Sequence, residues 1–203
     1  MNDIRIDGKG TIAGGEYGAI KVNGFAQSEG DVRAASVDVD GTMNCRGSLT
    51  ADLLDCDGAM KIEADLRVKK MMVDGMLRVT SGREIEAEEL FCDGSLHIDG
   101  QISADKMVVN GLIRAREIVG DQITISSSVG RLARLFIHNG SKADLIEATT
   151  IRLSGVTAKA VNGQDIVVGP FCEIDSLDCS GTLSVDPTAT IQRATGSFVR
   201  NDR

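Results

Sequence analysis

The chain has 203 residues and a net charge of −8, with 23 glycines, 2 prolines, 5 phenylalanines, 1 tyrosine and no tryptophan. Its 42% hydrophobic content excludes intrinsic disorder, and abundant glycine with so little proline excludes collagen. The acidic balance argues against a nucleic-acid partner, and no run approaches the roughly 18 apolar residues of a membrane span.

From residue 4 onward, a short alternating apolar run ending in Asp-Gly or Asn-Gly recurs along the chain. Successive glycines of these pairs lie 16 to 19 residues apart. A fixed period of this length indicates a repeat architecture. The pairs are Asp7 and Gly8, Asn23 and Gly24, Asp40 and Gly41, Asp57 and Gly58, Asp74 and Gly75, Asp93 and Gly94, and Asn110 and Gly111.

Each repeat unit contains three apolar pairs, and the members of each pair are two residues apart. In the unit around Gly41 they are Val32 and Ala34, Val37 and Val39, and Met43 and Cys45. A spacing of two is typical of a strand that sends both side chains to one side. The sequence therefore predicts an all-β fold, a triangular parallel β-helix with coils of about 17 residues. Right-handed winding is favoured because parallel crossovers are almost always right-handed.

The Asx-Gly pairs are predicted to be the corner turns of this helix. Glycine would supply a positive φ there, and the Asx side chain would bond to the local backbone. Proline would delete a ladder hydrogen bond inside a central strand, which explains its scarcity.

Later units are less regular, so we divide the chain into regular coils over 1–125 and degenerate coils with a C-terminal end over 126–203. Segment 83–89 carries two extra residues and is predicted to form a bulged acidic corner. A coil is expected at Leu135 and Ile137, whereas Ile166–Pro170 fits the pattern poorly.

Five cysteines without a Cys-x-x-Cys pair are typical of reduced thiols in a cytoplasmic protein. Membrane association through partners stays an open alternative. Cys56, Cys92 and Cys179 occupy slots that valine fills in other units, so we expect them to be buried and to hold no cofactor or metal.

Two alternative functional sites lack the sequence pattern that each would require. A calcium ladder along Asp40, Asp57, Asp74 and Asp93 would need the glycine-rich nonapeptide of calcium-binding rolls, which is absent. A catalytic histidine between coils, at His97 or His138, would suit a hexapeptide-repeat transferase. The 17-residue units break the six-residue register of that class, so no catalytic residue is predicted.

The ends of the helix are the predicted functional surfaces, since an uncapped solenoid exposes its last core layer. We expect end-to-end self-association there. The predicted contact residues are Ile4, Ile6 and Ile12 at the beginning of the chain, and Ile191, Phe198 and Val199 near its end.

The repeat units, for example Val37 to Cys45 and Met71 to Val79, resemble those of the bactofilins, polymer-forming bacterial cytoskeletal proteins. The resemblance extends over roughly residues 4–125. It implies a right-handed triangular β-helix that polymerises end to end without nucleotide into apolar filaments. In that family an aromatic residue near the C-terminal end supports polymerisation, and Phe198, then Phe171, is the nearest match.

The expected function is therefore a non-enzymatic scaffold for cell shape, polarity or motility structures. Its partner would be itself, with a paralogous bactofilin or other scaffold clients as further candidates. A β-helical transferase and a monomeric adaptor that binds through its side faces remain the alternatives.

Overall fold

The computed structural model describes residues 2–81, 84–127 and 140–200. The protein is an all-β parallel solenoid of about 11 turns of about 17 residues, as predicted, with no helix in the described ranges. Accordingly, no described helix is long and apolar enough to cross a membrane. The right-handed sense of winding stays a prediction, and the coil expected at Leu135 and Ile137 lies outside the described residues.

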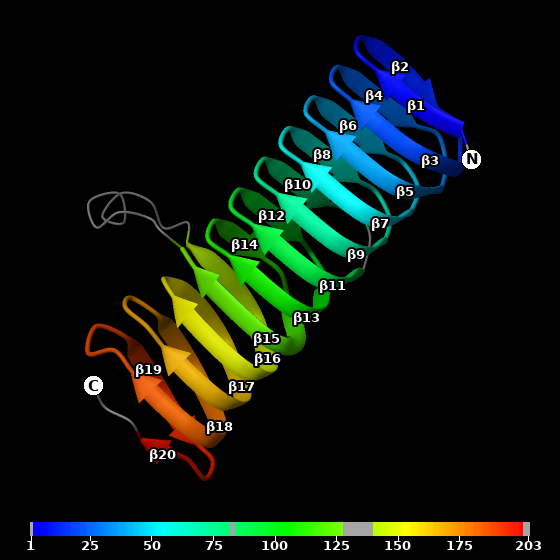
Figure 1. Ribbon diagram of the computed structural model, residues 1–203. Helices are drawn as coiled ribbons and strands as arrows, with labels where there is room; N and C mark the ends of the chain where they lie inside the picture. Colours follow the sequence, from blue (N-terminus) through cyan, green and yellow to red (C-terminus); the bar gives the residue numbers. More distant parts are fainter. Residues whose placement is uncertain (1, 82–83, 128–139, 201–203) are drawn as a thin grey trace.

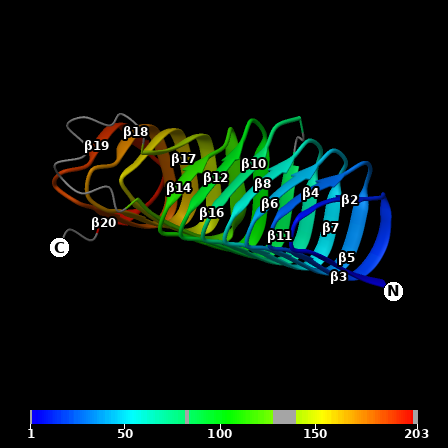
Figure 2. The same cartoon turned by 90° about the horizontal axis from the view of Figure 1, so that it is seen from above.

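The coils stack along one axis into a rod, with the two termini at opposite ends (Figures 1 and 2). Every described strand pairing is parallel, and residues pair with their equivalents in the neighbouring coil. The strands are β1 (Asn2–Ile6), β2 (Lys9–Ile12), β3 (Gly15–Val22), β4 (Phe25–Ser28), β5 (Val32–Val39), β6 (Thr42–Cys45), β7 (Leu49–Cys56), β8 (Ala59–Ile62), β9 (Leu66–Val73), β10 (Met76–Val79), β11 (Glu84–Cys92), β12 (Ser95–Ile98), β13 (Gln101–Val109), β14 (Leu112–Arg114), β15 (Glu117–Ser126), β16 (Ser141–Ser154), β17 (Val156–Val168), β18 (Glu173–Val185), β19 (Thr190–Thr195) and β20 (Val199–Arg200).

Each coil has three faces, and each face sends two side chains inward. Strand β5 bends once and forms two faces, and β6 forms the third. We name them the first face (Val32 and Ala34), the second face (Val37 and Val39) and the third face (Met43 and Cys45), together with the residues that pair with these in other coils. All six side chains are buried, which confirms the three predicted pairs.

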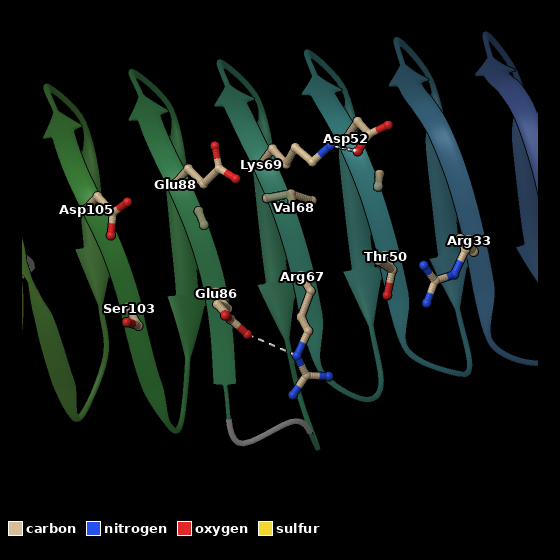
Figure 3. A pocket seen from close by; sticks show the side chains of 12 residues that line it. Arg33, Thr50, Asp52, Arg67, Val68, Lys69, Glu86, Glu88, Ser103 and Asp105 are labelled. Carbon is tan, nitrogen blue, oxygen red and sulfur yellow. Dashed lines mark hydrogen bonds and ion pairs between the residues drawn. The ribbon is translucent and has the colours of Figure 1, made fainter.

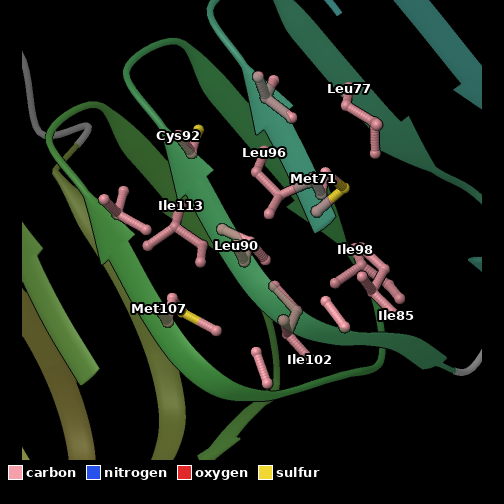
Figure 4. Close-up of a cluster of buried hydrophobic side chains, with 14 of the residues drawn as sticks. Met71, Leu77, Ile85, Leu90, Cys92, Leu96, Ile98, Ile102, Met107 and Ile113 are labelled. Atoms are coloured by element: carbon pink, nitrogen blue, oxygen red, sulfur yellow. The ribbon is translucent and has the colours of Figure 1, made fainter. Parts of the chain in front are cut away.

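Stacking turns the inward side chains into continuous columns (Figure 4). Leu90 pairs with Met71 of the preceding coil and with Met107 of the following one, and all three are fully buried. Burying such a side chain contributes roughly 1.5–3 kcal/mol. The flexible methionine side chains adapt to the irregular space between neighbouring side chains of the core.

The corner glycines serve close approach between coils and not a left-handed turn. Positive φ among the described glycines occurs at Gly15, Gly155 and Gly196, so the prediction of a positive φ at the Asx-Gly corners is wrong. A Cβ at a corner glycine would instead overlap the carbonyl oxygen of the corner glycine one coil earlier. Only a residue without a side chain lets these corners stack. The affected glycines are Gly24, Gly41, Gly58, Gly75, Gly94 and Gly111.

The first coils after residue 140 are shorter than the early ones and just as regular. Inward positions in β16 recur every five residues, and Ile146 pairs with Val161, 15 residues later. Ile166 and Val168, which the pattern fitted poorly, are buried in the second-face ladder. The loss of Asx-Gly in these coils therefore reflects tighter corners, not a degraded helix.

Cys179 lies in a different column from the predicted one. Cys56 and Cys92 do share the second-face column, where both pair with Val73. Cys179 instead pairs with Gly163 on the first face, in a column that also contains Ala148. Apolar pairs with a spacing of two occur on all three faces, so spacing alone does not identify the face.

The acidic segment 84–89 is a strand and not a bulge. Residues of β11 pair one for one with β9 and β13. Ile62 and Leu66 are four residues apart, whereas their partners Val79 and Ile85 are six apart. The two extra residues of this unit therefore lie between Val79 and Ile85.

The contact between stacked corners predicts that replacing glycine with alanine lowers the free energy of unfolding at one corner and leaves it unchanged at another. Gly58→Ala sets a methyl group against the carbonyl of Gly41, and we expect it to lower the free energy of unfolding by about 1–3 kcal/mol. Gly8→Ala is the matched control, because nothing lies within 4 Å of its Cβ position. Urea unfolding of dilute protein, followed by circular dichroism, measures both; equal midpoints would contradict the contact.

Candidate functional site

The N-terminal end of the rod is a coil whose strands are paired on one side. Among the described residues, β1 pairs with β3 and β2 pairs with β4. Ile4 is half-buried and Ile6 lies at the edge of the core. Ile12 is fully buried, so its predicted place in the end contact is corrected: its side chain belongs to the interior of the first coil.

The C-terminal end is more exposed. Both β19 and β20 pair with β18, and most of their residues face solvent. Ile191 and Phe198 pack partly buried against the core, whereas Val199 is 66% exposed. Of the three predicted residues at this end, Val199 offers the most apolar surface to another molecule.

Phe171 lies in the turn between β17 and β18, about one coil before the end. Its side chain is 41% exposed, and its backbone has a positive φ of 60°. Its amide donates a hydrogen bond to Thr188 Oγ1 at 3.2 Å. A left-handed conformation costs a non-glycine residue roughly 1–2 kcal/mol. An exposed aromatic residue is therefore held here at an energetic cost, close to the C-terminal end.

The predicted corner residues lie between strands, and their Asx side chains interact from coil to coil. Asn23 Nδ2 donates to Asp7 Oδ1 at 2.6 Å, and Asn110 Nδ2 donates to Asp93 Oδ1 at 2.8 Å. An amide beside a carboxylate replaces a like-charge contact with a hydrogen bond. The interspersed asparagines in the aspartate column are the sequence signal for these bonds.

The corner aspartates do not form a cage of ligands. In the described ranges, no three His, Cys, Asp or Glu side chains gather as ligands of one metal ion. Lys21 is close to two carboxylates, with its Nζ 3.3 Å from Asp40 Oδ2 and in hydrogen-bond contact with Asp38 Oδ2 at 2.5 Å. These contacts raise the pKa of Lys21, so the column is partly neutralised by a cation from the protein itself.

A shallow groove of about 530 Å³ crosses the first face from β5 to β13 (Figure 3). Its charged groups bind one another across coils: Lys69 Nζ lies 2.6 Å from Asp52 Oδ1, and Arg67 Nε lies 3.0 Å from Glu86 Oε2. These ion pairs are exposed and each contributes little to stability. The groove is therefore lined by ion pairs that join side chains of neighbouring coils.

His97 is half-buried on the outside of β12, as expected from its position between two inward residues. Its Nε2 lies 3.6 Å from Asp99 Oδ1. The neighbours of His97 in the ladder are Arg78 and Arg114, so it belongs to a row of basic side chains. His138 lies outside the described residues.

Two buried serines were missed by the sequence patterns. Ser127 and Ser141 share a hydrogen bond of 2.6 Å between their Oγ atoms. Ser141 Oγ also accepts a bond from the amide of Ile113 at 3.2 Å, and Ser127 Oγ donates to the carbonyl of Gly111 at 3.3 Å. These two residues flank 128–139 in the sequence. A serine in an inward slot, such as Ser141 two residues before Ala143, was the available signal.

All five cysteines are buried, and no disulfide joins them in the described part of the chain. Burial, together with a smaller effect of neighbouring carboxylates, raises the pKa of Cys56 and of Cys92 to about 12. Thiols with so high a pKa are weak nucleophiles and poor metal ligands at neutral pH. The structure therefore gives these residues the packing role predicted for them.

The fold defines a class, a parallel β-solenoid with charged side chains on its faces. Over 74 residues the chain is 34% identical to the uncharacterized protein YhbE of Bacillus subtilis (strain 168). The matched region is 36% of this chain and 31% of that protein, so the chain spans about a third of its relative's length. No protein-family model and no solved structure matches the chain.

The buried thiols predict a loss of stability in alkali. An unfolded thiol ionises near pH 9, whereas folded Cys56 and Cys92 keep their protons up to about pH 12. The unfolded state thus binds fewer protons in this window, and the free energy of unfolding falls from about pH 9 upward.

The matched variant is Cys56→Val with Cys92→Val, because valine fills the same column at Val73. Urea unfolding at about pH 8 and pH 10.5 should show a smaller loss in the variant than in the natural chain. Equal losses would mean that other groups cause the alkaline instability.

Proposed function

We propose that this chain is a non-enzymatic cytoskeletal subunit, related to the bactofilins, that assembles end to end into filaments. The observation that carries the proposal is that, among the described residues, the first and the last coil of one continuous parallel ladder are each paired on one side. Unpaired strand edges and a partly uncovered core accept further strands. A second copy supplies a coil of the same shape, so stacking repeats between molecules the contact that already joins coils within one molecule.

Gly8 supports close stacking at the N-terminal end. Each later corner glycine gives room to the carbonyl of the preceding coil, but nothing lies within 4 Å of the Cβ position of Gly8. Its φ is not positive, so no left-handed turn requires glycine there. The space beside Gly8 has room for the backbone of another coil. We assign that coil to a second copy of this chain.

The use of glycine supports the proposal that assembly needs no nucleotide. The glycine-rich elements that bind phosphates expose backbone amides to the ligand. Here corner amides donate to the neighbouring coil, as Gly41 N does to Val22 O at 2.9 Å. We therefore propose a cytoplasmic homopolymer that scaffolds cell shape, polarity or motility structures. A paralogue with the same coil length would fit the same ends.

Purified full-length chain in nucleotide-free buffer should form rods in negative-stain images and sediment faster as concentration rises. Gly8→Ala should shorten these polymers at least several-fold while leaving the circular dichroism spectrum unchanged, because its methyl group meets only an incoming coil. Gly30→Ala is the control, since its methyl group meets ordinary van der Waals distances of 3.5 Å or more. A concentration-independent monomer of the natural chain would refute end-to-end assembly.

A charge at the other end tests the C-terminal contact. Val199→Asp should shift polymers to short species, because stacking would bury the carboxylate without a partner. Val167→Asp is the control, since Val167 is an exposed valine on the outside of the second face. If the two variants polymerise equally well, the apolar C-terminal contact is wrong.

A further inference from the structure

The third face carries a row of basic side chains that repeats from coil to coil. Ladder pairing connects its members without a gap from β8 to β16. Their strand neighbours on either side point into the core, so the row lies on the outer surface. The row consists of Lys61, Arg78, His97, Arg114 and Lys142. Five basic side chains in a line are notable on a chain of net charge −8.

Part of this positive charge is not neutralised within the chain. Lys61 Nζ lies 2.7 Å from Glu63 Oε1, and His97 lies 3.6 Å from Asp99. Arg78 and Lys142 are exposed, and Arg78 has no carboxylate of the described residues within ion-pair distance. Neighbouring coils are about 4.8 Å apart, so the basic side chains of the row lie close together.

An acidic row runs along the corner that borders the same face. Asp57, Asp74 and Asp93 are exposed and each precedes a member of the basic row by four residues. Burial and the surrounding carboxylates, Asp57 first among them, raise the pKa of Asp55 on the neighbouring second face. This strip of the surface is therefore strongly negative.

Between the two rows lies a strip with little charge. It follows the outward positions that pair from β8 to β14, which are Ala59, Met76, Ser95 and Leu112. Met76 is 56% exposed, the largest exposure among the apolar side chains of the early coils. Across the third face the order is thus acidic, weakly apolar and basic, and it is the same in successive coils.

We propose that the third face binds the third face of a second copy, with the rods side by side and a two-fold axis parallel to their length. Rotation about that axis exchanges the two edges of the face and preserves the direction of the rod. The acidic row of each copy then faces the basic row of the other, and the strips around Met76 meet in the middle. A two-fold axis across the rods would set acid against acid.

The register of this contact follows from the repeat. Both copies have the same coil spacing, so one aligned coil aligns the others. Asp57, Asp74 and Asp93 of one copy face the row of Lys61, Arg78 and His97 in the other, and the symmetry repeats each contact. Several periodic charge pairs around a weakly apolar strip give orientation and register more than affinity, so the contact should be salt-sensitive.

A linear polyanion is the competing occupant, because a row of cations also fits its charges. The acidic row at the corner disfavours a polyanion. Asp74 and Arg78 are four residues apart, which is about 13 Å of extended chain. A polyanion bound to the basic row would therefore lie close beside a line of carboxylates. A second copy of this chain would contact both the acidic row and the basic row. This lateral contact does not depend on the end contacts, and the test keeps them apart.

The experiment uses full-length protein carrying Gly8→Ala and Val199→Asp, so that end stacking is weakened, and measures mass by sedimentation velocity. In about 50 mM salt we expect a concentration-dependent dimer, weakened at least about 10-fold in 500 mM salt. Arg78→Glu and Asp74→Lys should each weaken it by about 10-fold or more, because each creates two repulsive contacts in a symmetric dimer. Arg33→Glu, on the first face, is the charge-matched control and should not.

The decisive measurement mixes the Arg78→Glu protein with the Asp74→Lys protein. In the mixed pair both altered contacts are again between opposite charges, so the mixture should dimerise although neither component does alone. No recovery on mixing would overturn the two-fold arrangement. A monomer at low salt that binds polyphosphate through Arg78 and Arg114 would replace the proposal with polyanion binding. Filaments formed by the natural chain without lateral pairs would overturn this inference and leave end-to-end assembly intact.

Discussion

The stacking of each coil on the equivalent residues of the previous coil is the constraint on which the rest of the structure depends. Parallel pairing joins like to like, as in Val37 on Leu54 or Ile102 on Ile85. The backbones must come within ladder distance at every side and at every corner. Glycine is required at the Asx-Gly corners because the carbonyl of the preceding coil occupies the place of a side chain.

Like-on-like stacking also creates a problem for charged and polar side chains, since each column tends to collect one kind of group. In several columns, a neighbouring group reduces the repulsion between like charges. Asn23 and Asn110 bond to aspartates at the corner, and Lys70 lies 3.8 Å from Glu89 one coil away. Phe91 has the Nζ atoms of Lys70 and Lys106 each 5.6 Å from its ring centroid, a cation–π arrangement between two lysines. On the third face only part of the charge is relieved: Asn110 bonds to Asp93 and Lys61 pairs with Glu63, whereas Arg78 has no carboxylate of the described residues within ion-pair distance.

The two proposed contacts use different properties of the same repeat. End stacking uses backbone edges and the core cross-section, which are present once at each end. Side-by-side pairing uses the outer rows, which occur together in three successive coils, so it grows with the number of aligned repeats. A rod that combines both would lengthen through one contact and pair through the other. The first is mainly apolar and the second mainly electrostatic, so salt should separate them.

The sequence by itself determined the class of fold. Its 17-residue period and the three apolar pairs per unit predicted the coil, its faces and its buried residues, since strand alternation and repetition are local properties of the chain. The same patterns predicted the packing roles of Cys56 and Cys92.

Tertiary structure decided what depends on register between coils. The corner glycines serve contact and not a positive φ, Cys179 belongs to the first face, Ile12 is interior, and segment 84–89 is a strand. The charged rows of the third face became visible in the same way, because their members are 17 or more residues apart in sequence and become neighbours only when the coils stack. A period identifies equivalent positions, but only the ladder shows which side chains touch and what space each backbone leaves.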